Sequence, residues 1–195
     1  MKIPIHRKER IILTVIEIIN DLGIQGLSTR EIAKRQEISE GTLFKHFKNK
    51  NEILLSVLEH YSQYDMDIIQ SIRLKELCFG DAVKYFINSY VEYYENYPEI
   101  TAITQIYEVL ANDPKLVEKV LEIYNVRHDF IVEVVDNAKK SGELSTNIDS
   151  ICLSETILGF SNAICLRWRF EKFNFSLQKQ TMSGIDAIIE AFSKL

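Results

Sequence analysis

Residues 28–54 read STREIAKRQEISEGTLFKHFKNKNEIL, and this stretch holds two short helix signatures separated by a tight turn. Ser28 and Ser39 are each placed to cap a helix N-terminus, and a glutamate three residues after Ser28 completes a capping-box pattern. The second helix is expected over residues 40–46, after a turn at residues 37–39, and Asn49 is placed to cap the longer helix that follows. Two helices joined in this way form a helix-turn-helix, whose second helix can lie in the major groove of DNA. Helical hairpins also occur in ordinary bundles, so the layout alone does not establish DNA binding.

The rest of the chain places apolar residues at helical spacing, and no segment alternates as a strand would. Seven glycines and three prolines in 195 residues amount to about 5%, whereas the average usage of the two together is roughly 12%. This shortage of turn residues argues against a sandwich or a barrel. We therefore predict an all-α fold of about nine helices, over residues 6–22, 28–36, 40–46, 50–72, 81–96, 99–110, 114–141, 148–170 and 177–194.

The formal net charge of −5 comes from 23 Lys and Arg against 28 Asp and Glu. Taken whole, this charge argues against a general nucleic-acid coat or a polybasic membrane binder. Residues 1–60, however, contain ten basic and eight acidic residues, net +2, whereas residues 61–195 contain thirteen and twenty, net −7. Lys45, Lys48 and Lys50 follow one another just after the second short helix starts. The basic character is therefore local to the helix-turn-helix.

Cys78, Cys152 and Cys165 lie far apart in apolar surroundings and form neither a CxxC pair nor a Cys/His cluster with zinc spacing. We expect buried, reduced thiols, no metal site and no cofactor. No apolar run reaches the ~18 residues that span a bilayer, and the N-terminus lacks the apolar core of a signal peptide. We therefore expect a soluble, cytoplasmic protein.

Residues 41–54, together with residues 28–33, closely resemble the DNA-binding domain of TetR-family transcriptional regulators. The remaining chain is similar to that family only in length and helix count. The resemblance implies a helix-turn-helix DNA-binding domain over residues 1–48 and a helical ligand-binding and dimerisation domain over residues 49–195, connected by a helix over 49–72. It also implies a homodimer that binds a palindromic operator on double-stranded DNA, usually as a repressor, and that a small molecule releases.

The resemblance assigns DNA contacts to residues at the two helix starts and just beyond the second helix: Ser28, Thr29, Arg30, Ser39, Glu40, Gly41, Thr42, Phe44, Lys45, His46 and Lys50. Hydroxyl and backbone N–H groups at helix N-termini suit phosphate oxygens. By position, Thr29 corresponds to a phosphate contact, and His46 and Lys50 correspond to clamps on the DNA backbone. Glu40 either accepts a hydrogen bond from cytosine N4 or only complements the helix dipole.

Two positions depart from the family pattern. The family usually has tyrosine where this chain has Phe44, so a hydroxyl-to-phosphate hydrogen bond is lost. The family usually has glycine in the turn where Glu37 stands, and a positive φ there would strain the glutamate by about 1 kcal/mol. Leu43 and Phe47 are expected to fill the small core with Ile32 rather than to touch DNA.

The later helices carry tyrosines and apolar faces that suit a bundle core, a ligand cavity or a dimer interface. A cavity with a few hydroxyl groups would accept a hydrophobic ligand, and the candidates for its lining are Tyr90, Tyr94, Tyr107, Tyr124 and Trp168. These rings can equally be core residues. Charged residues of the same region can equally be solvated surface groups, namely Asp65, Asp67, Arg127 and His128. The expected inward stripe of the helix over 114–141 consists of Val117, Val120, Leu121, Tyr124, Ile131, Val134, Val135 and Ala138.

In the resembled family, the last two helices pack against their symmetry mates as a four-helix interface. The corresponding apolar residues in this chain are Ile157, Phe160, Ile164, Ile185, Ile188, Ile189 and Phe192. Small residues at Gly159, Ser161 and Ala163 would allow close approach. A symmetric dimer would hold two recognition helices about one DNA turn apart, ~34–36 Å.

Two other classes of function stay open. An enzyme is disfavoured because the sequence has no Glu-x-x-His iron site, zinc motif or phosphate-binding glycine loop, and its four histidines are scattered. A helical protein-interaction adaptor, or a small-molecule-binding protein without DNA binding, would share the fold class. A sequence-specific band-shift with DNA from upstream of the gene separates both from a regulator.

Overall fold

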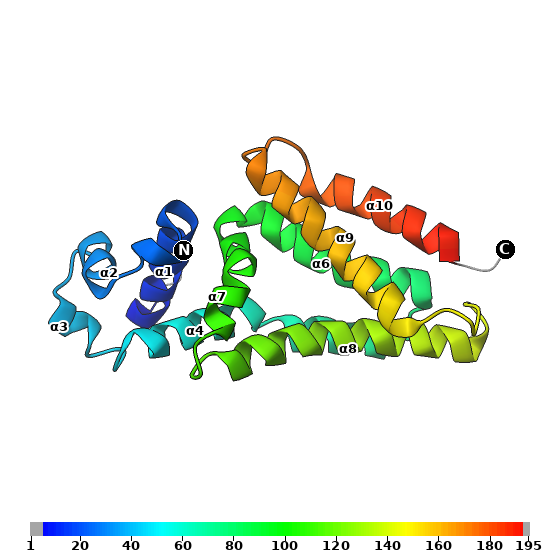
Figure 1. The fold of residues 1–195 in the computed structure, drawn as a ribbon, viewed down its shortest axis with the longest axis horizontal. Helices are drawn as coiled ribbons and strands as arrows, with labels where there is room; N and C mark the ends of the chain where they lie inside the picture. The colour runs from blue at the N-terminus through cyan, green and yellow to red at the C-terminus, as the bar shows by residue number, and fades with distance from the viewer. Residues whose placement is uncertain (1–5, 193–195) are drawn as a thin grey trace. The chain divides into compact units, whose positions relative to one another are not determined.

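The computed structural model describes residues 6–192, which form α-helices and short 3-10 helices (Figure 1). The all-α prediction is confirmed, and the described residues contain ten α-helices and three 3-10 helices. The chain divides into two compact units. The first comprises the described residues up to Gln63 together with Pro98–Ile123, and the second comprises Tyr64–Tyr97 and the described residues from Tyr124 onward. The predicted functional division after residue 48 stays a prediction.

The first unit is built around its first helix. Its elements are α1 (Arg7–Leu22), η1 (Ile24–Gly26), α2 (Thr29–Arg35), α3 (Glu40–Leu43), α4 (Lys50–Ser62), η2 (Pro98–Ala102), η3 (Thr104–Ile106), α7 (Tyr107–Ala111) and the beginning of α8 (Val117–Ser141). Helix α1 packs against α2, α4 and η2, and it buries an isoleucine-rich face that includes Ile11 and Ile16. Ile32, Leu43 and Phe47 are also buried, which confirms their predicted place in the core.

Two predicted helices are interrupted in the structure. The helix predicted over 50–72 ends at Ser62, and a separate helix, α5 (Asp65–Lys75), follows it. The helix predicted over 99–110 is replaced by η2, η3 and α7. In that segment, the hydroxyl groups of Thr101 and Thr104 donate to the carbonyl groups of Pro98 and Thr101, three residues earlier. Such local side-chain hydrogen bonds compete with regular α-helix, which accounts for the tighter turns.

The second unit contains α5, α6 (Phe79–Asn96), most of α8, α9 (Ser150–Phe170) and α10 (Leu177–Phe192). Helix α10 packs against both α6 and α9 (Figure 1). The contact of α9 with α10 requires a glycine, because a Cβ atom at Gly184 would lie 2.0 Å from the ring of Phe160. The packing of α10 on α6 and α9 buries residues such as Ile157 and Ile185, and α8 contributes Phe130 and Ile131 to the interior of this unit.

The buried face of α8 differs from the predicted stripe. Leu121 and Tyr124 are about half exposed, whereas Val120 and Ile123 are buried. Val120, Ile131, Val135 and Ala138 are buried as predicted, and Ile123 joins them. The prediction was wrong at Leu121 and Tyr124 because α8 is apolar on more than one side, so spacing alone did not fix its inward face.

The cysteines also depart from the prediction. Cys165 is buried, and burial raises the pKa of its thiol to about 11. Cys78 and Cys152 are exposed, so the expectation of buried thiols was wrong for both. Over residues 6–192, no helix is long and apolar enough to span a bilayer, and no three His, Cys, Asp or Glu side chains gather as a metal site.

Candidate nucleic-acid interface

The helix-turn-helix is held by two serine caps. Ser28 Oγ accepts a hydrogen bond from the backbone N–H of Glu31 at 3.1 Å, and Ser39 Oγ accepts one from the N–H of Thr42 at 3.1 Å. Both caps confirm the sequence prediction. By helix geometry, the N–H groups of Thr29 and Arg30 have no acceptor within α2. Each helix start therefore presents polar groups while its serine side chain stabilises the turn.

A hydrogen bond joins the two helices of the motif across their N-terminal ends. Thr29 Oγ1, on α2, donates to Glu40 Oε2, on α3, at 2.6 Å. The two interpretations of Glu40 from sequence did not include this role. Glu40 also lies in the first turn of α3, where a negative charge complements the helix dipole. A contact of Glu40 with a cytosine stays a prediction.

The turn and the end of α3 show how the recognition segment is shaped. Glu37 has a φ of 52°, so the position does adopt the left-handed conformation that the family pattern suggested. Helix α3 is shorter than predicted and ends at Leu43. The N–H groups of Lys45 and His46 then donate to carbonyl oxygens three residues back, which winds the segment more tightly. The short helix therefore ends in a compact turn before Phe47 enters the core.

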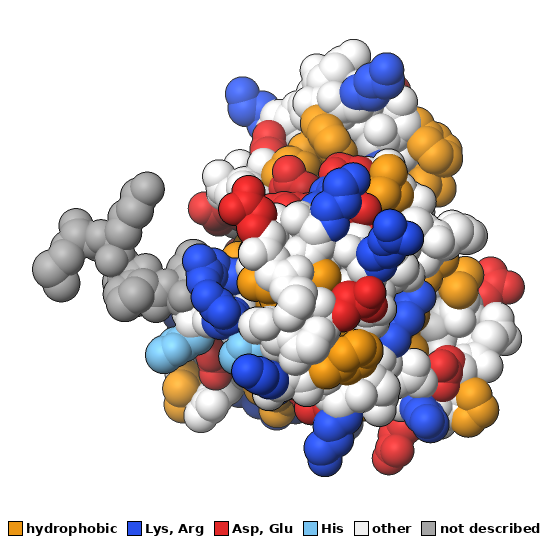
Figure 2. Space-filling model, turned by 90° about the vertical axis from the view of Figure 1, so that its left-hand side faces the viewer, with side chains coloured by type: hydrophobic (Ala, Val, Ile, Leu, Met, Phe, Trp, Pro, Cys, Tyr) orange, Lys and Arg blue, Asp and Glu red, His pale blue; other side chains and the backbone are white. Residues whose placement is uncertain are grey.

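Helix α3 and the turn that follows it have one buried and one exposed side. Leu43 and Phe47 point into the core, whereas Gly41, Phe44 and Lys45 are exposed, with Phe44 47% exposed. Figure 2 looks onto the side of the molecule where α2 and α3 lie in Figure 1, and it shows Lys and Arg side chains interspersed with uncharged, Asp and Glu side chains. A Cβ atom at Gly41 would meet only Ser39 Oγ, at 3.7 Å, so the fold does not require glycine at this position.

The segment that follows α3 is fixed by a second set of contacts. Asn49 caps α4 by accepting a hydrogen bond from the N–H of Glu52 at 2.9 Å, as predicted. Lys50 Nζ donates to the carbonyl oxygen of Leu27 at 2.8 Å. An ammonium group has three N–H donors, so this bond and a phosphate contact are compatible. His46 is half-buried, and Lys45 and Lys48 are exposed.

Two residues that sequence reasoning missed hold α2 against α1. Arg35 donates to Asp21 Oδ2 at 2.8 Å and to Glu31 Oε1 at 3.1 Å, and Gln36 donates to Thr14 Oγ1 at 2.7 Å. The hydrogen bond from Arg35 is the main cause that lowers the pKa of Asp21. The four-residue spacing of Glu31 and Arg35 was the available signal for part of this network. These contacts fix the position of α2, which carries part of the candidate interface, against α1.

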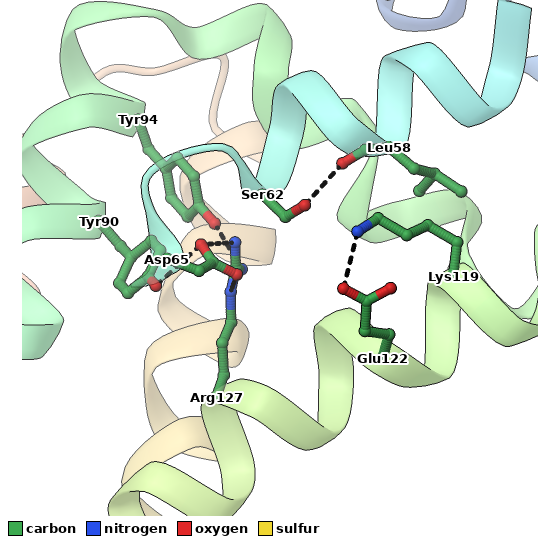
Figure 3. Close-up of polar contacts among 8 residues, drawn as sticks. All are labelled: Leu58, Ser62, Asp65, Tyr90, Tyr94, Lys119, Glu122 and Arg127. Atoms are coloured by element: carbon green, nitrogen blue, oxygen red, sulfur yellow. Dashed lines mark hydrogen bonds and ion pairs between the residues drawn. The ribbon is translucent and has the colours of Figure 1, made fainter. Parts of the chain in front are cut away.

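In the second unit, two of the predicted pocket residues lie in a polar cluster with two charged residues. Arg127 donates from Nε to Asp65 Oδ2 and from Nη2 to Asp65 Oδ1, both at 2.9 Å (Figure 3). The hydroxyl of Tyr90 donates to Asp65 Oδ1 at 2.9 Å, and Tyr94 Oη accepts from Arg127 Nη1 at 3.3 Å. Asp65 is only 3% exposed. The interpretation of Asp65 and Arg127 as solvated surface groups was therefore wrong, whereas Asp67 is exposed.

The other three pocket candidates do not join this cluster. Tyr107 belongs to the first unit, where its ring packs edge-to-face on Tyr61 at 5.9 Å between centroids. Tyr124 is 50% exposed and stacks on His128. Trp168 is buried and donates from Nε1 to the carbonyl oxygen of Phe175 at 2.8 Å. The packing supports the alternative interpretation of Trp168 as a core residue.

The predicted interface residues are divided between core and surface. Ile157, Ile185 and Ile189 are buried inside the single chain, so they are not available to a partner, and their assignment to an interface was wrong. Helical spacing showed that these residues are apolar but not which neighbour covers them. Phe160, Ile164 and Ile188 are half-buried. Phe192 is exposed at the end of α10.

Comparison with known proteins connects this geometry to a class. Residues 11–57 match the family model described as bacterial regulatory proteins, tetR family. Tetracycline repressor protein class C of Escherichia coli is 40% identical over 53 residues, which are 27% of this chain and 24% of that protein. The segment matched by the family model, residues 11–57, contains α2, α3 and the start of α4. The sequence match therefore covers the candidate interface.

Solved structures match almost the whole chain. The transcriptional regulator FadR from Bacillus subtilis, in complex with stearoyl-CoA, has a TM-score of 0.79 at 20% identity, over 92% of this chain and 96% of that chain. The ketosteroid transcriptional regulator KstR2 of Mycobacterium tuberculosis has a TM-score of 0.85 at 15% identity, over 99% of this chain and 98% of that chain. At these identities the likeness shows a shared fold.

The helix-turn-helix and its family match define the class of its DNA-binding segment, which is that of bacterial transcriptional regulators. Residues 11–57 form a TetR-family DNA-binding domain, and the fold of the whole chain is shared with regulators of known structure.

Proposed function

We propose that the protein is a cytoplasmic homodimeric repressor that binds a palindromic operator and is released by a small hydrophobic molecule. The observation that carries the proposal is the exposed surface of α3 and of the turn that follows it. Gly41 on α3 and Phe44 and Lys45 in the turn are exposed, within the segment that the family model matches. The exposed polar and basic groups of α2, α3 and the start of α4 supply the contacts to bases and phosphates.

The proposed dimer forms through the last two helices, with a surface that differs from the one predicted from sequence. The exposed positions of α9 follow one stripe along the helix, and they include Ile151, Gly159, Ala163 and Phe170. A Cβ atom at Gly159 would meet nothing within 4 Å, so a partner helix can approach closely there. Ile151 is 55% exposed and Phe170 is 76% exposed. The exposure of these apolar residues on a single chain supports a symmetric interface in which a second copy covers them.

The proposed ligand is hydrophobic because the interior of the second unit consists mostly of apolar and aromatic side chains and because of the regulators that share the fold. One of these was solved with stearoyl-CoA, and another is described as a ketosteroid regulator. Stearoyl-CoA is therefore the first probe to use. A ligand can release DNA only to the extent that it binds the non-binding conformation more tightly.

A footprint on DNA from upstream of the gene tests the proposal. We expect two protected half-sites, related by a two-fold axis and centred about one DNA turn apart, ~34–36 Å, or a multiple of this distance. Light scattering on the same protein should give a dimer. Protection of a single site by a monomer would overturn the homodimer, and loss of protection on adding stearoyl-CoA would identify the class of ligand.

A further inference from the structure

The chain passes between the two units three times, and each passage lies close in sequence to a member of the Asp65 cluster. The passages fall at Gln63–Tyr64, Tyr97–Pro98 and Ile123–Tyr124. Asp65 follows the first passage directly after Tyr64. Tyr94 precedes the second within one helical turn, and Arg127 follows the third within one helical turn. The cluster therefore joins, inside the second unit, the ends of all three connections.

The geometry of the cluster fixes these chain ends relative to one another. The guanidinium group of Arg127 forms two parallel hydrogen bonds with Asp65, so it sets both the distance and the orientation between the start of α5 and α8. The contact with Tyr94 Oη adds α6 to the arrangement. The guanidinium carbon of Arg127 also lies 4.4 Å from the ring centroid of Tyr90, which is on α6 like Tyr94 (Figure 3). Three segments distant in sequence are thus held by directional bonds.

A buried ion pair is a costly way to hold a fold together. The desolvation of two charges offsets most of their attraction, so a pair of well-packed apolar residues usually stabilises a protein as much or more. What hydrogen-bonded charges provide and apolar contacts do not is a defined geometry. The cost of the pair therefore favours a positional role over a purely stabilising one.

We propose that Asp65 and Arg127 are positioning residues for operator binding. By fixing the three connections, they allow the first units of the two chains in a dimer to match the spacing of the half-sites. The proposal rests on the proposed function. Tyr90 packs on Phe86, with centroids 4.9 Å apart, and Phe86 packs on Phe130 of α8 at 5.0 Å. These ring contacts also join α6 to α8 beside the cluster.

The test compares two double variants on the same pair of helices. Asp65→Leu with Arg127→Met removes the buried pair and retains apolar bulk. Arg73→Met with Glu133→Leu removes an exposed pair that also joins α5 to α8, and it serves as the matched control. For each protein, thermal unfolding and light scattering establish the fold and the dimer. Binding is then measured on the full operator found by footprinting and on a single half-site.

For the buried-pair variant, we expect half-site affinity within about twofold of wild type and full-operator affinity at least about tenfold weaker, because simultaneous engagement is lost. The control should bind both DNAs as wild type does. A folded, dimeric Asp65→Leu/Arg127→Met protein with wild-type affinity for the full operator would overturn the positional role.

If that variant does not fold, Tyr90→Phe with Tyr94→Phe removes only the hydroxyl groups. An unchanged ratio of full-operator to half-site affinity in it would also overturn the proposal. Failure of the wild-type protein to bind any operator would instead reject the proposed function.

Discussion

Thr29 Oγ1 donates a 2.6 Å hydrogen bond to Glu40 Oε2, which joins the starts of the two helices of the DNA-binding motif. A threonine hydroxyl has one O–H donor, so Thr29 does not donate to a phosphate while it is bound to Glu40. A hydrogen bond from the Thr29 hydroxyl to a phosphate therefore requires Glu40 to release that hydroxyl. Cytosine N4 is a donor that would draw the Glu40 carboxylate away, and base recognition would then free a phosphate contact.

Glu40→Ala tests this linkage. The variant frees the Thr29 hydroxyl and removes a negative charge that repels phosphates, so we expect affinity for unrelated DNA to rise about threefold or more. Discrimination between operator and unrelated DNA should fall. Glu59→Ala, at an exposed acidic residue of α4, controls for the change in net charge. Titrations of both DNAs by fluorescence anisotropy give the ratio of operator affinity to affinity for unrelated DNA. An unchanged ratio in Glu40→Ala would contradict the linkage.

Gly41→Ala separates folding from binding at the recognition helix. An added Cβ meets no atom of the protein closer than 3.7 Å, and alanine is favoured over glycine in a helix by about 0.5–1 kcal/mol. We therefore expect a slightly higher free energy of unfolding together with weaker operator binding, because the methyl group would hold α3 away from DNA. Urea unfolding and a band-shift measure the two effects. Wild-type operator affinity in this variant would mean that α3 does not approach DNA at Gly41.

Lys50→Ala removes the proposed clamp on the DNA backbone. We expect weaker binding to all DNA sequences alike and a salt slope smaller by roughly 1 per half-site. The lost hydrogen bond to Leu27 should lower the free energy of unfolding by about 1 kcal/mol. Lys50→Arg keeps the charge and should keep the slope. Measurement of affinity against salt concentration decides the point, and a changed sequence preference with an unchanged slope would falsify the clamp.

His60 makes the stability of the first unit dependent on pH. Burial is the main cause that lowers its pKa below the ordinary value, with the nearby charge of Glu9 acting in the opposite direction. As the pH falls below about 6.5, His60 of the unfolded chain binds a proton before His60 of the folded chain does. The free energy of unfolding should therefore decrease between pH 7 and pH 5.5. His60→Gln should show a smaller decrease in urea unfolding, and equal decreases in both proteins would rule out this role.

Local features of the first unit could be predicted from the sequence, because their causes lie within a few residues. Ser28, Ser39 and Asn49 cap helices as their spacing indicated. The buried positions of Leu43 and Phe47 also followed from the pattern. The family resemblance placed the candidate interface on the same segment that the comparison with known proteins matches.

Features that depend on distant contacts could not be predicted. Helical spacing runs without interruption through residues 50–72, and the break before Asp65 accompanies a carboxylate that meets Arg127, 62 residues away. The same reason explains Thr29 and Glu40, whose pairing depends on how two helices cross. Ile157 and Ile185 showed an apolar pattern, yet only the packing of α9 and α10 reveals that their own chain covers them.

The first unit is proposed to recognise a specific DNA sequence. The most direct test is the affinity of the wild-type protein for the footprinted upstream fragment, measured against a scrambled fragment of equal length and composition at physiological salt. The proposed function predicts at least about 10³-fold tighter binding to the natural sequence. Equal affinity for the two fragments, from a folded and dimeric protein, would contradict it.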